Sequence, residues 1–145
     1  MSVRITPFEM SDYDAAVSLW SDAEGVVLGS ADDRDAIARF LAHNGGLSFV
    51  ARHDGRLVGA ALCGSDGRRG YLHHVAVEAA SRRQGIASAL VERCLEALRG
   101  RGVQKCHLFV LVGNEDALRF WDRAGWARRG DLVMMSRVLA ETVGP

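Results

Sequence analysis

The stretch HHVAVEAASRRQGIASAL, which runs from His73 to Leu90, decides the fold of this chain. Its first part is a short apolar run with β-branched residues, and such a run is typical of a strand. Two arginines and a glycine follow, and from Gln84 onward apolar residues recur on one helical stripe, at Ile86, Leu90, Val91, Cys94, Leu95 and Leu98. The stretch therefore predicts a strand that ends in a basic turn and opens directly into a helix.

The turn between this strand and this helix is suited to binding an anion. The first N–H groups of a helix have no intrahelical acceptor, and the helix dipole adds partial positive charge there. Gly85 permits close approach, Ala87 keeps the next position small, and Arg82 and Arg83 add fixed charge. Pyrophosphate fits these features best. The alternative is a solvated basic loop, because the residues match neither the Walker pattern nor the dinucleotide-binding fingerprint.

The rest of the chain predicts a mixed α/β sheet built in the order βααββ, βα, βα, ββ. The dipeptide Asp54-Gly55 is a strong hairpin signal, and the near-continuous apolar run at 105–112 indicates a central strand covered on both faces. Strands are expected at 3–8, on both sides of the hairpin turn within 47–64, and at 71–77, 105–112, 126–130 and 132–139, with a loose tail at 140–145. Helices are expected at 11–20, 31–46, 84–100 and 114–125.

Composition restricts the class of protein. A chain of 145 residues fits one domain, and 18 basic against 18 acidic residues argue against nucleic acid or an anionic membrane as a general partner. Cys63, Cys94 and Cys106 lack metal-ligand or redox spacing and are interpreted as reduced packing residues. With no signal peptide and no apolar run of about 18 residues, we expect a soluble cytoplasmic protein.

Two motifs in order resemble those of the GCN5-related N-acetyltransferase (GNAT) superfamily, and the resemblance extends from about Val3 to Arg137. VAVEAASRRQGIASAL resembles its acyl-CoA signature, Arg/Gln-x-x-Gly-x-Gly/Ala. NEDALRFWDRAGW resembles the Asn-x-x-Ala-x-x-Phe-Tyr-x-x-x-Gly-Phe motif that follows it. The resemblance implies one N-acetyltransferase domain over residues 1–145, with the GNAT-like acyl-CoA N-acyltransferase fold. That fold would be a mixed, mostly antiparallel sheet of six to seven strands with four flanking helices.

The resemblance also implies how acetyl-CoA would be held, with no metal. Its pantetheine arm would enter between a splayed fourth and fifth strand, as though adding a strand. Val75 and Val77 would offer backbone groups to the acetyl carbonyl and the arm; Asn114 would contact the arm, and Trp121 would lie beside the cofactor. The pyrophosphate would be bound mainly by main-chain N–H groups of Arg82, Arg83, Gln84, Gly85, Ile86 and Ala87. The alternatives are strand packing, a charged turn and a plain N-cap.

The catalytic residues follow from the strand YLHHVAV. Regular alternation would place Tyr71, His73, Val75 and Val77 on one face, and Leu72, His74 and Ala76 on the other. The segment resembles His-Leu-His-x-Leu-Ala-Val of the arylalkylamine N-acetyltransferases, with His73 at the second histidine. We predict His73 as general base, the alternative being a structural histidine; His74 is interpreted as packing or edge polarity.

A tryptophan stands where many family members have a tyrosine that donates a proton to the thiolate. The indole N–H of Trp121 can donate a hydrogen bond but cannot serve as a practical acid. Water or Tyr71 would then protonate the thiolate, or the leaving group would depart without an acid. The substitution also leaves open a CoA-binding protein with little transferase activity.

The expected function is transfer of an acetyl group from acetyl-CoA to a primary amine of a small molecule, directly in a ternary complex. The alternatives are a peptide or protein N-terminus as acceptor, a noncatalytic CoA-binding module, and a protein whose turn binds another anion. Acids of the first two helices and their loop would attract a cationic amine or form a solvated face: Asp22, Glu24, Asp32 and Asp33. Family habit and exposed sheet edges make a homodimer possible.

Overall fold

The computed structural model describes residues 2–140, and its centre is one five-stranded sheet. The strands are β1 (Arg4–Pro7), β2 (Phe49–His53), β3 (Arg56–Ser65), β4 (Gly70–Val77) and β5 (Cys106–Leu108), and they lie side by side in chain order. β1 to β4 pair antiparallel, whereas β4 and β5 run parallel. The mixed, mostly antiparallel architecture is therefore confirmed.

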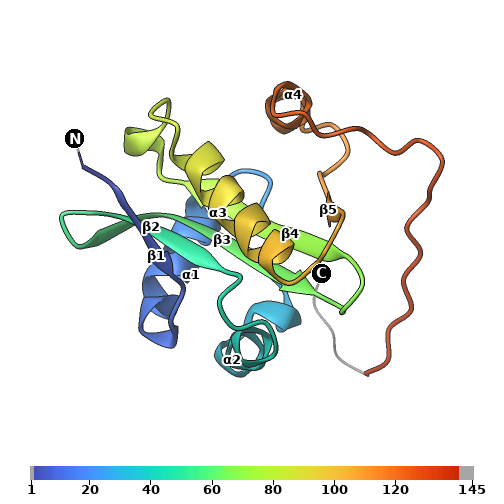
Figure 1. Ribbon diagram of the computed structural model, residues 1–145, viewed down its shortest axis with the longest axis horizontal. Helices are drawn as coiled ribbons and strands as arrows, with labels where there is room; N and C mark the ends of the chain where they lie inside the picture. Colours follow the sequence, from blue (N-terminus) through green and yellow to red (C-terminus); the bar gives the residue numbers. More distant parts are fainter. Residues whose placement is uncertain (1, 141–145) are drawn as a thin grey trace.

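Four helices accompany the sheet, as predicted: α1 (Tyr13–Asp22), α2 (Arg34–His43), α3 (Ile86–Gly100) and α4 (Glu115–Arg123). Figure 1 shows α3 crossing one face of the sheet, while α1 and α2 lie on the opposite side. Trp20 and Ile37 pack with Leu62 in the core under α1 and α2, and Leu90 packs with Cys63 in the core under α3. Within residues 2–140, no helix has both the length and the apolarity to cross a membrane.

The hairpin between β2 and β3 forms where the sequence predicted it. Asp54 and Gly55 make the turn with φ angles of 52° and 77°, both in the left-handed region. Two successive positive φ angles match the right-handed twist of the flanking strands, and aspartate and glycine tolerate them best. The turn pairs His53 with Arg56, and a register shift between Ala51 and Arg52 then places Phe49 opposite Ala61.

The expected six to seven strands are not found, and the prediction of two final strands at 126–130 and 132–139 is wrong. The structure has no strand in residues 126–140, and Figure 1 shows this segment running apart from the sheet. Its composition is suited to a strand, but a strand exists only where a ladder partner and a packing surface are present. The tail predicted at 140–145 lies outside the described residues from 141 onward. The exposed apolar side chains of the segment are Leu132, Val133, Met134, Met135, Val138 and Leu139.

The prediction of a central strand at 105–112 is also wrong. β5 contains only Cys106–Leu108 and forms the last strand of the sheet, and the three apolar residues Phe109, Leu111 and Val112 are exposed. An apolar run is buried on both faces only where other elements pack against each side of the sheet. Residues 109–112 follow the end of β5, and the exposure of Phe109, Leu111 and Val112 shows that no element within the described residues covers these side chains.

A bulge in β4 overturns the predicted alternation of its side chains. Ala60 lies opposite Ala76 and Leu62 opposite His73, so one residue of β3 faces two residues of β4. His74 absorbs the extra residue with a φ of 51°. Leu72, Val75 and Val77 consequently pack toward α3, whereas His73, His74 and Ala76 pack toward α1 and α2.

The three cysteines are free, and they line the core under α3. Burial raises the pKa of Cys106 to about 12, and the neighbouring Cys63 acts in the same direction. Hydrogen bonding to Cys63, together with burial, raises the pKa of Cys94. The thiols of Cys94 and Cys106 are therefore protonated, whereas the hydrogen bond with Cys94 lowers the pKa of Cys63. All three cysteines are packing residues, as predicted.

Candidate active site

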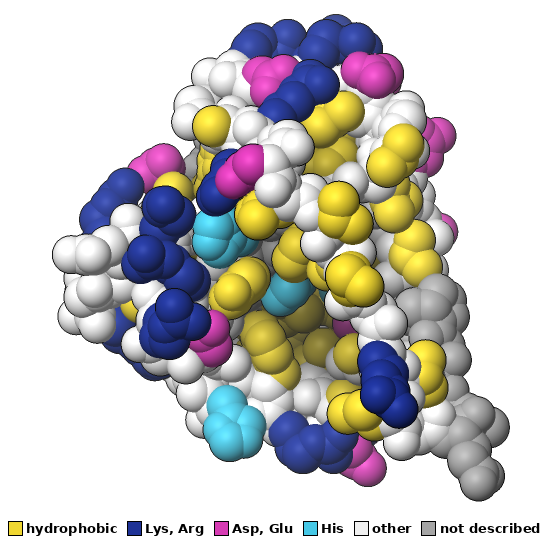
Figure 2. Space-filling model, turned by 90° about the vertical axis from the view of Figure 1, so that its right-hand side faces the viewer, with side chains coloured by type: hydrophobic (Ala, Val, Ile, Leu, Met, Phe, Trp, Pro, Cys, Tyr) yellow, Lys and Arg dark blue, Asp and Glu magenta, His cyan; other side chains and the backbone are white. Residues whose placement is uncertain are grey.

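The sheet opens between β4 and β5. The two strands pair only from Gly70 to Leu72 with Cys106 to Leu108, although β4 continues to Val77. From His73 onward the backbone of β4 therefore has no strand on that side within residues 2–140. Figure 2 shows this side of the molecule hollowed, with hydrophobic side chains along the hollow and histidine side chains inside it. An extended, amide-bearing ligand can pair with such an open edge.

The helix after β4 begins in an unusual backbone conformation. Gly85 caps α3 with a φ of 75°, and Arg83 also has a positive φ, of 65°. The first intrahelical bond runs from the N–H of Ala89 to the carbonyl oxygen of Gly85, at 3.0 Å. The N–H groups of Ile86 and Ala87 precede that bond, and they lie at the positive end of the helix dipole.

This turn fits the pyrophosphate of acetyl-CoA. A Cβ placed on Gly85 would meet no atom within 4 Å, so the space beside the cap is open. Arg82, Arg83 and Gln84 are exposed, whereas the side chain of Ile86 is buried in the core and anchors the helix start. A hollow of about 530 Å³ adjoins the turn and is lined by Val3, Ile5, Gln84, Gly85, Ile86 and Ala89. The six residues predicted for the pyrophosphate thus lie in one continuous turn.

Asn114 caps α4, as predicted, and also contacts the loop after α1. Its Oδ1 accepts a hydrogen bond from the N–H of Ala117 at 3.2 Å. Its Nδ2 also lies against Gly25: a Cβ added to Gly25 would be only 2.5 Å from this nitrogen. A hollow of about 430 Å³ between the two segments is lined by Glu24, Gly25, Leu111, Val112, Gly113, Asn114, Glu115 and Asp116. No local pattern of residues predicted this contact.

Trp121 lies in an aromatic group at the end of α4. Its ring meets the rings of Phe120 and Trp126 edge to face, with centroids 4.9 and 5.4 Å away. The half-buried ring also packs against the core under α3. These contacts establish a packing role for Trp121.

The imidazole of His73 is half-buried and neutral at pH 7. Its ring meets the edge of the Phe40 ring, with centroids 6.2 Å apart. Burial, helped by the charge of His74, lowers the pKa of His73 below its ordinary value, and Asp32 opposes that shift. A neutral imidazole can accept a proton from an attacking amine.

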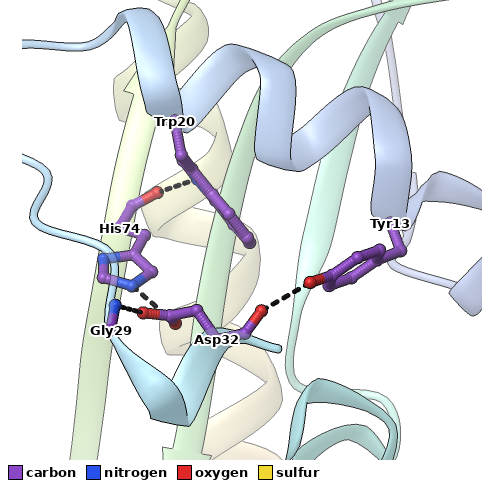
Figure 3. Close-up of polar contacts among 5 residues, drawn as sticks. All are labelled: Tyr13, Trp20, Gly29, Asp32 and His74. Atoms are coloured by element: carbon purple, nitrogen blue, oxygen red, sulfur yellow. Dashed lines mark hydrogen bonds and ion pairs between the residues drawn. The ribbon is translucent and has the colours of Figure 1, made fainter. Parts of the chain in front are cut away.

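His74 forms a pair with Asp32 that the sequence did not predict (Figure 3). Its Nε2 lies 2.8 Å from Oδ1 of Asp32, and both side chains are largely buried. The N–H of Gly29 donates to Oδ2 of Asp32, and the hydroxyl of Tyr13 donates to the backbone oxygen of Asp32. Asp32 is therefore neither free to attract a cationic amine nor part of a solvated acidic face, which were the two roles expected from the sequence. Asp33 caps α2 instead, accepting from the N–H of Ala36.

The indole of Trp20 secures the backbone of the same histidine. Its Nε1 donates to the carbonyl oxygen of His74 at 2.7 Å, in a fully buried position. We expect Trp20→Phe to lower the free energy of unfolding by about 1–3 kcal/mol, because a buried carbonyl loses its donor. Urea denaturation measures this loss. Trp126→Phe, on the other face of the sheet, is the control, and an equal or larger loss in the control would contradict the assignment.

Tyr71 lies at the paired end of β4. Its ring packs against the ring of His107, with centroids 5.7 Å apart, where β4 and β5 are still joined. The structure thus brings His73 and His74 together on one face, with the backbone of Val75 and Val77 along the open edge. Tyr71 lies two residues before His73 on the same strand.

Comparison with known proteins agrees with this geometry. The model of the acetyltransferase (GNAT) family matches residues 13–126. An acetyltransferase of Pectobacterium atrosepticum is 32% identical over 141 residues, which cover 97% of this chain and 98% of that protein.

Two solved structures share the fold. The ribosomal-protein-alanine N-acetyltransferase of Brucella melitensis biovar Abortus superposes with a TM-score of 0.72 at 22% identity, covering 94% of this chain and 100% of that chain. The protein AAC(6')-Iy, bound to the bisubstrate analogue CoA-S-monomethyl-acetylneamine, gives a TM-score of 0.74 at 15% identity, covering 96% and 100%. Together with the open edge of β4 and the turn before α3, these findings show that the chain belongs to the acetyltransferase (GNAT) family and is an acetyl-CoA-dependent acetyltransferase.

Proposed function

We propose that this protein is a single-domain N-acetyltransferase that acetylates a primary amine of a small molecule by direct transfer in a ternary complex. The observation that carries the proposal is the neutral imidazole of His73 beside the open edge of β4. His73 accepts the proton of the attacking amine, directly or through water. This arrangement supports direct transfer, because one base beside the thioester would be sufficient.

Other residues of the site bind and orient acetyl-CoA in this proposal. The backbone groups of Val75 and Val77 hold the acetyl carbonyl and the pantetheine arm along β4. Asn114 contacts the arm, and Trp121 borders the cofactor site. Water or Tyr71 supplies the proton for the departing thiolate. The pyrophosphate is bound by the turn that contains Arg82, Arg83, Gln84, Gly85, Ile86 and Ala87.

A peptide N-terminus is the second candidate acceptor. One fold relative is a ribosomal-protein-alanine N-acetyltransferase, whereas the ligand of the other carries acetylneamine. Both classes of amine therefore belong in the same test.

The test is acetyl-CoA-dependent thiol release by the purified protein. The acceptor panel contains arylalkylamines, polyamines, amino acids, aminoglycosides and short N-terminal peptides. Release with small amines supports the proposal, and release with peptides alone supports the second candidate. Bound CoA without release for any acceptor would favour a noncatalytic CoA-binding module.

We also propose that the protein forms a homodimer. The outer edge of β5 and the apolar side chains of residues 132–139 offer surface that a second copy would bury. Light scattering after size-exclusion chromatography is expected to give twice the 15.7 kDa chain mass. A single-chain mass over the micromolar range would contradict this proposal.

A further inference from the structure

The contact between His74 and Asp32 joins two parts of the chain that are distant in sequence. His74 lies in the middle of β4, whereas Asp32 ends the 3-10 helix η2 (Ser30–Asp32) in the connection from α1 to α2. The two side chains are only 18% and 13% exposed, and the distance between Nε2 and Oδ1 is 2.8 Å. Their contact ties that connection to the strand that carries His73.

The backbone of His74 is held in a conformation that few residues other than glycine adopt inside a strand. Its φ is 51°, in the left-handed region, which asparagine, aspartate and histidine tolerate better than most side chains. The bulge at this position absorbs one residue more than the core needs, because Leu72 and Val75 both face α3 although two residues separate them. Glycine would adopt this conformation without strain, but it could not make the contact with Asp32 that the imidazole makes.

Three further contacts fix the pair (Figure 3). Trp20 binds the carbonyl oxygen of His74 and packs its ring against the imidazole, with centroids 5.1 Å apart. Gly29 and Tyr13 hold the carboxylate and the backbone of Asp32. The orientation of His74 is thus determined from both its main chain and its side chain.

We propose that Asp32 and His74 form a positioning pair that sets the orientation and charge environment of His73 for acetyl transfer. This inference rests on the proposed role of His73 as general base. The bulge places both imidazoles on the α1–α2 face, so the pair acts on His73 from the adjacent residue. Neither Asp32 nor His74 needs to contact the acceptor.

The charged groups around His73 determine in which direction each substitution should shift its pKa. His74 on its own strand disfavours the charged form of His73, Asp32 from η2 favours it, and α2 presents the uncharged ring of Phe40. The pKa of His73 lies below that of an ordinary imidazole, mainly because the ring is buried. Removal of His74 should therefore raise the pKa of His73. Removal of the Asp32 charge should lower it further.

The first experiment is an NMR titration of the His73 imidazole in the full chain, without acceptor. His74→Asn retains a residue that tolerates positive φ, and Asp32→Asn retains the shape of the carboxylate. Controls of the same chemistry are His43→Asn and Asp35→Asn, at exposed positions of α2. We expect the pKa of His73 to rise in the first variant and fall in the second. Shifts in the same direction, or no shifts, would overturn the proposal.

The second experiment measures steady-state kinetics on the same four variants. We expect kcat to fall about tenfold in His74→Asn and in Asp32→Asn, because each variant loses one charge-assisted hydrogen bond. The KM for acetyl-CoA should remain unchanged. The double variant should be no slower than the slower single variant, because both changes break one unit. If the wild type transfers no acetyl group, the proposed function fails, and the opposite NMR shifts still decide whether the pair controls His73.

Discussion

Replacement of His73 by alanine is expected to lower kcat by roughly 100- to 10,000-fold, the usual contribution of a general base. The KM for acetyl-CoA should change little, because the proposed binding site for the cofactor consists of the backbone of β4 and the turn before α3. Thiol-release kinetics with saturating acetyl-CoA separate the two effects. His43→Ala, an exposed histidine at the end of α2, is the control. Equal turnover of the His73 variant and the wild type would remove this residue from the mechanism.

The pH profile of the wild type tests the same role independently. Burial lowers the pKa of His73, so the neutral, active form persists below the ordinary value of about 6.5. The kcat/KM for acetyl-CoA-saturated enzyme should therefore stay level as the pH falls through 6.5 and decline only at lower pH. A decline centred above pH 6.5 would show that another group controls the reaction.

Replacement of Gly85 by valine should weaken acetyl-CoA binding by about 10- to 100-fold, which corresponds to the loss of one or two charge-assisted hydrogen bonds. The residue has a φ of 75°, where a β-branched side chain is strongly disfavoured, and its Cβ would occupy the space beside the first N–H groups of α3. Both effects would act on the proposed pyrophosphate site. Calorimetric titration with acetyl-CoA measures the affinity.

A control substitution at a second glycine distinguishes the effect of backbone strain from the effect of filling the binding space. Gly67 has a φ of 90° in the turn between β3 and β4, and a Cβ there also meets nothing within 4 Å. Gly67→Val should cost similar thermal stability while leaving acetyl-CoA affinity unchanged. Equal loss of affinity in both variants would show that strain, rather than the turn at Gly85, accounts for the effect.

Local signals explain why much of the fold was predictable. The cap at Asn114, the turn at Asp54-Gly55 and the apolar stripe of α3 each depend on residues close in sequence. The turn at Gly85 was predictable for the same reason, because its glycine, arginines and helix start are contiguous.

The errors arose where structure depends on distant partners. Residues 105–112 and 132–139 have strand-like composition, but pairing partners determine whether such segments join a sheet. The positions of His73 and His74 depend on the bulge, which absorbs one residue more than the core needs between Leu72 and Val75. The partner of His74 is 42 residues away, and two adjacent aspartates gave no indication of which one would cap the helix.

The bulge in β4 lets the strand contain one residue more than its core face needs. Leu72 and Val75 enter the same core although two residues separate them, whereas regular alternation places residues only two positions apart on one face. Deletion of either histidine would therefore remove the bulge and leave Leu72, Val75 and Val77 on the same face. The surplus residue serves the opposite side of the sheet, because it places two adjacent imidazoles toward α1 and α2.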